Sequence, residues 1–260
     1  MQEARSLLAA EPVRHNLILS LLHDRVARPE PGRYWIAAAG GRVAGLLFQS
    51  PLAYPAVASP MSRSVIEAMV DSVGADSTLP GVNAEAETSA QFAGQWAEQR
   101  KTPAIPVQGL RLYELVKLNS VKLADGGLRQ ATPADRELAS AWLRAFQAEA
   151  DEGAASDPAA LADRWIGAGQ LWFWEHNQLV AMAAARGPVE GVFRVGPVYT
   201  PPELRGCGYG TACVHELSRR LLENGARPCL YTDLGNPTSN SIYRRIGYRA
   251  LTEWVRYRFG

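Results

Sequence analysis

Apolar and polar positions along the chain alternate between helical and strand-like spacing. The first half opens with leucines and valine at helical spacing between residues 7 and 22. Two strand-like runs follow, 34–38 and 43–48, joined by Gly40-Gly41 in the manner of a β-hairpin. The remaining elements expected here are an amphipathic helix over 62–73, a short strand over 82–86, a helix over 88–100 with Thr88 as its N-cap, and a strand over 110–118.

The second half repeats this order of elements. It begins with a short strand over 128–131 and a helix over 133–150, capped by Thr132. A glycine-rich turn later separates a strand over 192–200 from a helix over 208–223. The other elements expected are a helix over 157–166, strands over 170–175 and 179–185 around a turn at 176–178, a strand over 229–233, a helix over 238–246 and a final strand or strand pair over 248–259.

Both halves therefore read αββ(β)αβαβ, which predicts a two-domain α/β protein. We expect a twisted mixed sheet flanked by helices in each domain. The polar, glycine-bearing stretch 120–127 is the candidate linker, which divides the chain into domains at 1–119 and 128–260. The similar order, without identical repeats, suggests two tandem copies.

Composition restricts the class of protein but does not identify it. The chain is 47% hydrophobic and 20% charged, with a net charge of +1, so we expect no nucleic acid and no membrane as partner. The three cysteines and four histidines lack metal-site spacing, so we expect no metal and small buried cysteines in a reducing cytosol. We find neither a signal-peptide pattern nor a run of ~18 apolar residues, and a cytoplasmic location is expected.

The segment 196–211 is the most informative part of the chain. A strand ends there, the chain turns through Gly206, Gly208 and Gly210, and a helix begins. The first turn of a helix has unpaired N–H groups and the positive end of the helix dipole. Glycine lets the backbone approach an anion closely and adopt positive φ. The segment therefore predicts an anion site suited to a pyrophosphate.

Three other interpretations of these glycines exist. A P-loop needs a lysine after the last glycine, and none follows Gly210. A dinucleotide-binding turn needs a third glycine where Thr211 stands. The remaining alternative is a glycine turn that binds nothing.

The wider pattern resembles the GNAT superfamily, the acyl-CoA-dependent N-acyltransferases. The loop reads Arg205-Gly206-Cys207-Gly208-Tyr209-Gly210, which matches the superfamily signature R/Q-x-x-G-x-G/A. With the preceding Val198-Tyr199-Thr200-Pro201-Pro202-Glu203 it is similar to a group of predicted bacterial acetyltransferases. Downstream, Asn236, Ser239, Tyr243 and Gly247-Tyr248 resemble the second motif of the superfamily. The resemblance covers about residues 128–260.

The resemblance implies an acetyl-CoA site and roles for its residues. The backbone of Val198, Tyr199 and Thr200 would pair with the pantetheine arm as an added strand. Asn236 and Ser239 would contact the coenzyme, with Asn236 bonding the pantetheine amides. Tyr243 would lie near the thioester sulfur as the catalytic acid. The N–H groups that would hold the pyrophosphate belong to Arg205, Gly206, Cys207, Gly208, Tyr209, Gly210 and Thr211.

The sequence departs from the superfamily at the general base. Many members carry a glutamate on the strand before the loop, whereas 192–200 has Arg194 as its only charged residue. Glu203 in the loop and Glu190, Glu175 and His176 near strand ends are weaker candidates. A water chain could serve instead, or the amine could arrive neutral.

The function expected is acetyl transfer from acetyl-CoA to an amine, on a small molecule first and on a protein as the other possibility. The alternatives are a non-catalytic acyl-CoA-binding regulatory or interaction module and a purely structural double domain. The N-terminal half has no glycine in its corresponding turn, 58–62, where Pro60 also lacks an N–H. We expect it to bind no coenzyme, to bury Trp35, Leu46 and Phe48 in its own core, and to bound the acceptor site.

Overall fold

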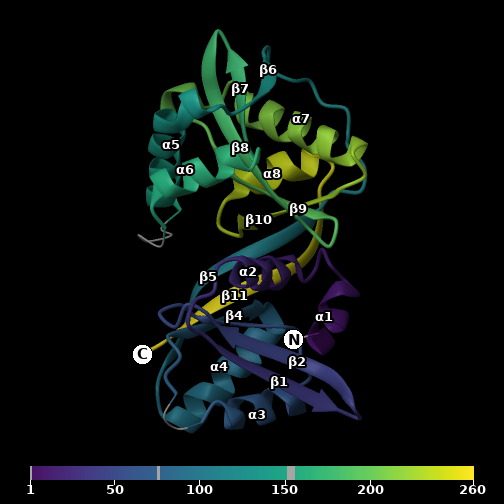
Figure 1. Ribbon diagram of the computed structural model, residues 1–260, viewed down its shortest axis with the longest axis vertical. Coiled ribbons are helices and arrows are strands. Elements are labelled where there is room, and N and C mark those ends of the chain that lie inside the picture. The colour runs from purple at the N-terminus through teal and green to yellow at the C-terminus, as the bar shows by residue number, and fades with distance from the viewer. Residues whose placement is uncertain (1, 75–76, 151–155) are drawn as a thin grey trace. The chain divides into compact units, whose positions relative to one another are not determined.

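The computed structural model describes residues 2–74, 77–150 and 156–260, which form two compact units. Unit 1 comprises Met1–Leu112, Thr232–Pro237 and Ala250–Gly260. Unit 2 comprises Tyr113–Tyr231 and Thr238–Arg249. The last strand of the chain, yellow in Figure 1, thus belongs to the unit built from the N-terminal half.

Unit 1 is a mixed sheet with helices packed against it. Its strands follow the order β1-β2-β3-β4-β11-β5. Its helices are α1 (Gln2–Ala9), α2 (Asn16–Ala27), α3 (Arg63–Ser72) and α4 (Ala86–Arg100), and its strands are β1 (Arg33–Ala39), β2 (Arg42–Gln49), β3 (Ala56–Ala58), β4 (Gly81–Glu85), β5 (Ala104–Glu114) and β11 (Arg249–Phe259).

Unit 2 has the strand order β10-β9-β8-β7-β6. Its strands are β6 (Gly127–Gln130), β7 (Leu171–His176), β8 (Gln178–Val189), β9 (Val192–Tyr199) and β10 (Arg227–Asp233). Its helices are α5 (Arg136–Glu149), α6 (Pro158–Gly167), α7 (Tyr209–Glu223) and α8 (Pro237–Ile246), with short 3-10 turns η1 (Pro133–Asp135) and η2 (Pro202–Leu204).

Four consecutive strands of each unit pair in the same way. β1–β2 and β2–β3 are antiparallel and β3–β4 is parallel. In unit 2, β7–β8 and β8–β9 are antiparallel and β9–β10 is parallel. The two units therefore share a strand topology, as expected from the similar order of elements in the sequence; their origin as tandem copies stays a prediction.

Helices cover both faces of the unit 2 sheet (Figure 1). On one face, α7 buries Ala212, Cys213 and Leu217 against small residues of β8, including Ala181 and Ala183. On the other face, a second cluster joins α5 and α6 to β7 and β8 through Leu143, Trp165, Leu171, Phe173 and Met182. Successive residues of β8 thus point to opposite faces, as the pleat of a strand requires.

The core of unit 1 forms where the sequence predicted it. Leu46 and Phe48 are buried, and Trp35 packs against the cluster that α3 and α4 form on the sheet. One cap prediction was wrong: α4 begins at Ala86, and Glu85 is its N-cap. The Thr88 hydroxyl instead accepts a hydrogen bond from the Met61 N–H at 3.4 Å, so a tertiary contact replaced the local cap.

Strand β5 also departs from the sequence prediction, since it runs over Ala104–Glu114 rather than 110–118. Its early part contains Pro106 between the exposed Ile105 and Val107, a composition typical of a loop. Pairing with β11 draws this part into the sheet. Strand propensity depends on such neighbours more than on the residues themselves.

The stretch expected to be a linker, 120–127, packs as part of unit 2. Leu123 and Ala124 lie against the α7 cluster, and the Asp125 carbonyl accepts a hydrogen bond from Trp174 Nε1 at 3.1 Å. Just before it, the Asn119 carbonyl lies 3.1 Å from Nε2 of the buried His215 on α7. The observed units therefore differ from the division at 1–119, 120–127 and 128–260, most of all in the placement of β11.

Candidate functional site

The glycine-rich loop between β9 and α7 has the backbone conformation that its sequence predicts. Gly206 and Gly208 both have φ of +82°, in the left-handed region that favours glycine. Gly208 is the N-cap of α7 and has no side chain with which to cap it. The loop therefore brings a bare helix start to the end of β9.

Gly210 is required for close packing rather than for its φ. A Cβ on this residue would lie 3.1 Å from Oγ1 of Thr200, the residue that follows β9. A side chain here would push the helix start away from the strand end. The sequence thus places the first turn of α7 directly against Thr200.

The first turn of α7 has the features of an anion site. The first helical hydrogen bond runs from the Ala212 N–H to the Gly208 carbonyl at 3.0 Å, so the N–H groups of Tyr209, Gly210 and Thr211 have no acceptor within the helix. No acidic residue stands in this turn to occupy the positive end of the dipole.

The Arg205 side chain joins the loop to the end of β9 and to the end of α5. Its Nε donates to the Thr200 carbonyl at 2.9 Å, and its Nη2 lies 2.7 and 2.8 Å from the two carboxylate oxygens of Glu149 at the end of α5. Both side chains of this ion pair are 47% exposed, so solvent screens it. The guanidinium also lies 5.8 Å from the centre of the Tyr199 ring.

Strand β9 separates from β10 towards the loop. The pairing joins Val192, Phe193 and Arg194 to Arg227, Pro228 and Cys229 and goes no further. On its other side, β9 stays paired with β8 as far as Val198 and Tyr199. The edge of β9 at Val198–Thr200 is therefore not used by β10, and an extended ligand could pair with it as an added strand.

Tyr243 lies on α8, half-buried against the same cluster as Val198 and Tyr209. Its ring centre is 6.5 Å from that of Tyr113 and 6.0 Å from that of Tyr248. Burial raises the pKa of the Tyr243 phenol to about 12. The hydroxyl is therefore protonated at any physiological pH and can donate a hydrogen bond.

Sequence reasoning missed Arg245 near the helix start and named His176 only as a weak candidate base. Arg245 Nη2 lies 3.4 Å from the Thr211 hydroxyl and adds a positive charge beside the first turn of α7. The His176 ring lies 5.8 Å from the Tyr209 ring. Arg245 stands two residues after Tyr243 in the second motif, so that motif contained the signal; nothing in the sequence pairs His176 with Tyr209.

The other residues named from the sequence are Asn236, Ser239 and the three cysteines, and they lie in different elements and loops. Asn236 belongs to unit 1, where its N–H donates to the Asp233 carbonyl at 3.1 Å. Ser239 lies on α8, and its role also stays a prediction. Cys213 and Cys229 are buried as expected, but Cys207 is exposed, because it sits between two glycines of a surface loop.

No candidate general base is distinguished by its surroundings. Glu203 is exposed in η2. Glu175 lies 3.1 Å from the Arg129 guanidinium in an ion pair. Glu190 occupies the turn between β8 and β9, and β9 itself carries Arg194 and no carboxylate.

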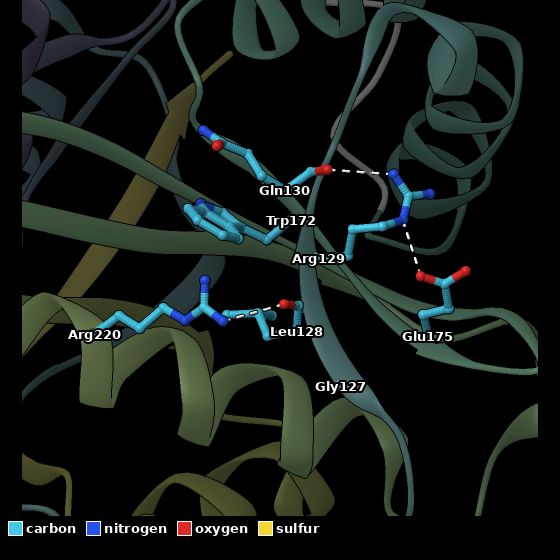
Figure 2. Close-up of a pocket in the computed structure, with 7 residues that line it drawn as sticks. All are labelled: Gly127, Leu128, Arg129, Gln130, Trp172, Glu175 and Arg220. Atoms are coloured by element: carbon cyan, nitrogen blue, oxygen red, sulfur yellow. Dashed lines mark hydrogen bonds and ion pairs between the residues drawn. The ribbon is translucent and has the colours of Figure 1, made fainter.

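A surface hollow of about 470 Å³ lies elsewhere on unit 2, beside the edge strand β6 (Figure 2). Its cations are engaged: Arg129 contacts Glu175, and Arg220 donates to the Leu128 carbonyl at 3.2 Å and covers the Trp172 ring at 5.1 Å. It contains none of the predicted coenzyme residues. Its lining consists of Gly127, Leu128, Arg129, Gln130, Trp172, Glu175 and Arg220.

No group of three or more His, Cys, Asp or Glu side chains in 2–74, 77–150 and 156–260 is placed to hold a metal ion. No helix in the same ranges has the length and apolarity needed to span a membrane.

Comparison with known proteins agrees with this geometry. Residues 175–258 match the family model described as FR47-like protein, and this segment contains the β9–α7 loop and α8. No curated protein matches the chain.

The fold is shared with solved acetyltransferases over both units. The chain is similar to a GNAT-family acetyltransferase from Colwellia psychrerythraea (12% identity, 87% of this chain and 85% of the other, TM-score 0.62). It is also similar to GCN5-related N-acetyltransferases from Sphaerobacter thermophilus (15%, 92% and 84%, TM-score 0.62) and Kribbella flavida (19%, 93% and 93%, TM-score 0.59). The chain is thus similar to GNAT-family acetyltransferases in fold over both units, and it matches the FR47-like family model over residues 175–258.

Proposed function

We propose that the protein transfers the acetyl group of acetyl-CoA to an amine of a small molecule. The observation that carries this proposal is the bare, acid-free start of α7 beside the unpaired edge of β9 at Val198–Thr200. The start of α7 suits the pyrophosphate of the coenzyme, and the edge of β9 suits the amide-bearing pantetheine arm that continues from it.

The coenzyme would lie along these two features in order. The N–H groups of the loop and first turn, from Arg205 to Thr211, would hold the pyrophosphate. Arg245 is close enough to Thr211 to add charge there. The backbone of Val198–Thr200 would pair with the pantetheine arm, and Asn236 and Ser239 are proposed as further contacts.

Transfer then needs stabilisation of two developing charges. The amine nitrogen attacks the thioester carbonyl carbon, and negative charge forms on the carbonyl oxygen, where an N–H of β9 near Val198 can stabilise it. The C–S bond breaks and the electron pair leaves with sulfur. The amine nitrogen loses a proton, which goes to water or to a base.

Tyr243 is proposed to act on the departing sulfur. With its pKa raised to about 12, its phenol lies about 3 units above an ordinary thiol, so full proton transfer to the thiolate costs roughly 4–5 kcal/mol. A strong hydrogen bond from the phenol to the thiolate needs no such transfer. We therefore assign Tyr243 as the donor that stabilises the thiolate, while the final proton comes from the acylated amine through solvent.

The experiment is an acceptor screen that detects free thiol as acetyl-CoA is consumed by the full chain. Amine-dependent thiol release is expected, with mass spectrometry showing the acetylated amine. Coenzyme binding without thiol release from any amine would instead favour the second candidate, a non-catalytic acyl-CoA-binding module. This second candidate is favoured by one observation: β9 carries no carboxylate that could act as the general base.

Unit 1 is proposed to bind no coenzyme. Its corresponding turn has no glycine, and the Met61 N–H there already donates to Thr88. The buried Ser59 hydroxyl accepts from the Leu46 N–H at 2.9 Å, which closes the turn further. Calorimetric titration of the full chain should give one acetyl-CoA per chain, and two equivalent sites would contradict this assignment. The further proposal that unit 1 bounds the acceptor site rests on the sequence alone.

A further inference from the structure

Three arginines lie on one face of the unit 2 sheet. Arg186 on β8 is the direct cross-strand partner of Arg194 on β9, and Arg194 is in register with Cys229 on β10. Arg227, two residues before Cys229, shares its face. Directly paired residues point to the same side of a sheet, so the three guanidinium groups start from one face of three adjacent strands.

This arrangement is unfavourable without an anion. Like charges placed opposite each other on neighbouring strands destabilise the pair. Arg194 makes no hydrogen bond or ion pair within the described parts of the chain, and its Nε is buried without a partner. Buried polar groups are nearly always paired, so an unpaired guanidinium nitrogen calls for an explanation. Glu114 is a carboxylate close enough to act on Cys229 at this place, which leaves an excess of positive charge.

Arg186 is held in place by its own contacts. Its Nε donates to the Gly196 carbonyl at 3.1 Å, and its guanidinium lies 5.5 Å from the centre of the Trp165 ring on α6. These contacts put the arginines on the α5–α6 side of the sheet. A fixed Arg186 beside an unpaired Arg194 is a pre-organised recognition site for a planar oxyanion.

The arginines lie on the same strand as the proposed transfer site. Arg194 precedes Val198 by four residues, which corresponds to about 13 Å along a strand. The opposite face near Val198 is filled by the cluster of α7 and α8. An acceptor that reaches the thioester from the α5–α6 side would therefore pass the arginine pair.

We infer that Arg186 and Arg194 bind a carboxylate of the acceptor, so that the substrate class is an amine carrying a carboxylate at a distance of several bonds. This inference rests on the proposed acetyl transfer. A carboxylate fits the site because its two oxygens match the fork of a guanidinium, and because two arginines supply enough N–H donors to satisfy both oxygens. A phosphate has the same charge and acceptor chemistry, so the test includes one.

The test uses acceptors of equal length that differ only at the far end. The probes are ε-aminocaproate, hexylamine and 4-aminobutyl phosphate, measured with the full chain by thiol release from acetyl-CoA and by calorimetry with CoA bound. The wild type should prefer ε-aminocaproate over hexylamine by about tenfold to a hundredfold, the scale of lost charge-assisted hydrogen bonds.

The variants separate recognition from folding. Arg194→Met should remove most of this preference by weakening ε-aminocaproate binding and raising its KM. The KM for hexylamine should not change. Arg194→Lys should restore part of the preference for ε-aminocaproate. This variant also replaces Arg194→Met in the test if the Met variant does not fold. Arg220→Met is the matched control, because Arg220 lies on the same unit at the far end of α7 and should leave the preference intact.

The outcomes distinguish this inference from the proposed function. Equal use of ε-aminocaproate and hexylamine, a preference that Arg194→Met leaves unchanged, or tighter binding of the phosphate would overturn the carboxylate site while acetyl transfer stands. Binding of ε-aminocaproate that depends on Arg194, without thiol release from any amine, would support the site and refute the transfer reaction.

Discussion

Gly208→Asp tests the coenzyme site most directly. The residue is the N-cap of α7 at φ of +82°, and a Cβ added there would meet its nearest neighbour, the Ala124 Cβ, at 3.8 Å. That is ordinary contact distance, so the side chain has room. The protein should therefore stay folded with an added carboxylate beside the N–H groups that we assign to the pyrophosphate.

Two terms set the size of the effect. Holding a non-glycine residue in the left-handed region costs about 1–2 kcal/mol, and aspartate tolerates it better than most residues. A carboxylate about 5 Å from a phosphate, at an effective dielectric constant of about 20 to 80, repels it by about 1 to 3 kcal/mol. Acetyl-CoA affinity should therefore fall roughly fivefold to 150-fold.

Gly225→Asp is the matched control. Gly225 follows the other end of α7, has φ of +72°, and has no atom within 4 Å of an added Cβ. It carries the same backbone strain and the same added charge, far from the helix start. Gly225→Asp should lose more stability than Gly208→Asp in thermal melts, because its carboxylate stands at the negative end of the helix dipole, but only Gly208→Asp should lose coenzyme affinity by calorimetry. Equal coenzyme affinities would show that the pyrophosphate assignment is incorrect.

Three further predictions follow from the structure. Tyr243→Phe should lower kcat about 10²-fold with little change in coenzyme affinity; an unchanged single-turnover rate would remove the phenol from the mechanism. A fragment starting at Tyr113 should keep a folded unit 2 but expose the buried Trp254 to a fluorescence quencher, because β11 would lose its place beside β4; a Trp254 as protected as in the full chain would contradict this. Burial raises the pKa values of the Cys229 thiol and the Tyr243 phenol to about 12, so their stabilising contribution is complete below their unfolded values of about 8.5 and 10 and is lost as the pH rises towards 12. Urea unfolding of the wild type should show falling stability over that range, with a shallower slope in Cys229→Ala.

The sequence alone determined the features that depend on neighbouring residues. Glycines at 206 and 208 allow the positive φ that both adopt at the start of α7, and the helix after them follows from its apolar spacing. Thr132 caps the 3-10 turn η1 just before α5, and its N–H and hydroxyl both donate to the Asp135 carboxylate, although the α-helix itself begins at Arg136 and not at 133 as predicted. The anion-ready helix start therefore needed no tertiary information.

Tertiary structure decided everything that depends on pairing between distant segments. No local pattern predicts that β11 pairs with β4, which lies more than 150 residues away in the sequence, because a strand pairs equally well with any edge of suitable register. The same holds for the arginine pair: Arg186 and Arg194 look unrelated in the chain until the β8–β9 register sets them side by side. Local sequence thus determined the loop that is proposed to hold the coenzyme, whereas strand pairing brought together the arginines that are proposed to bind the acceptor.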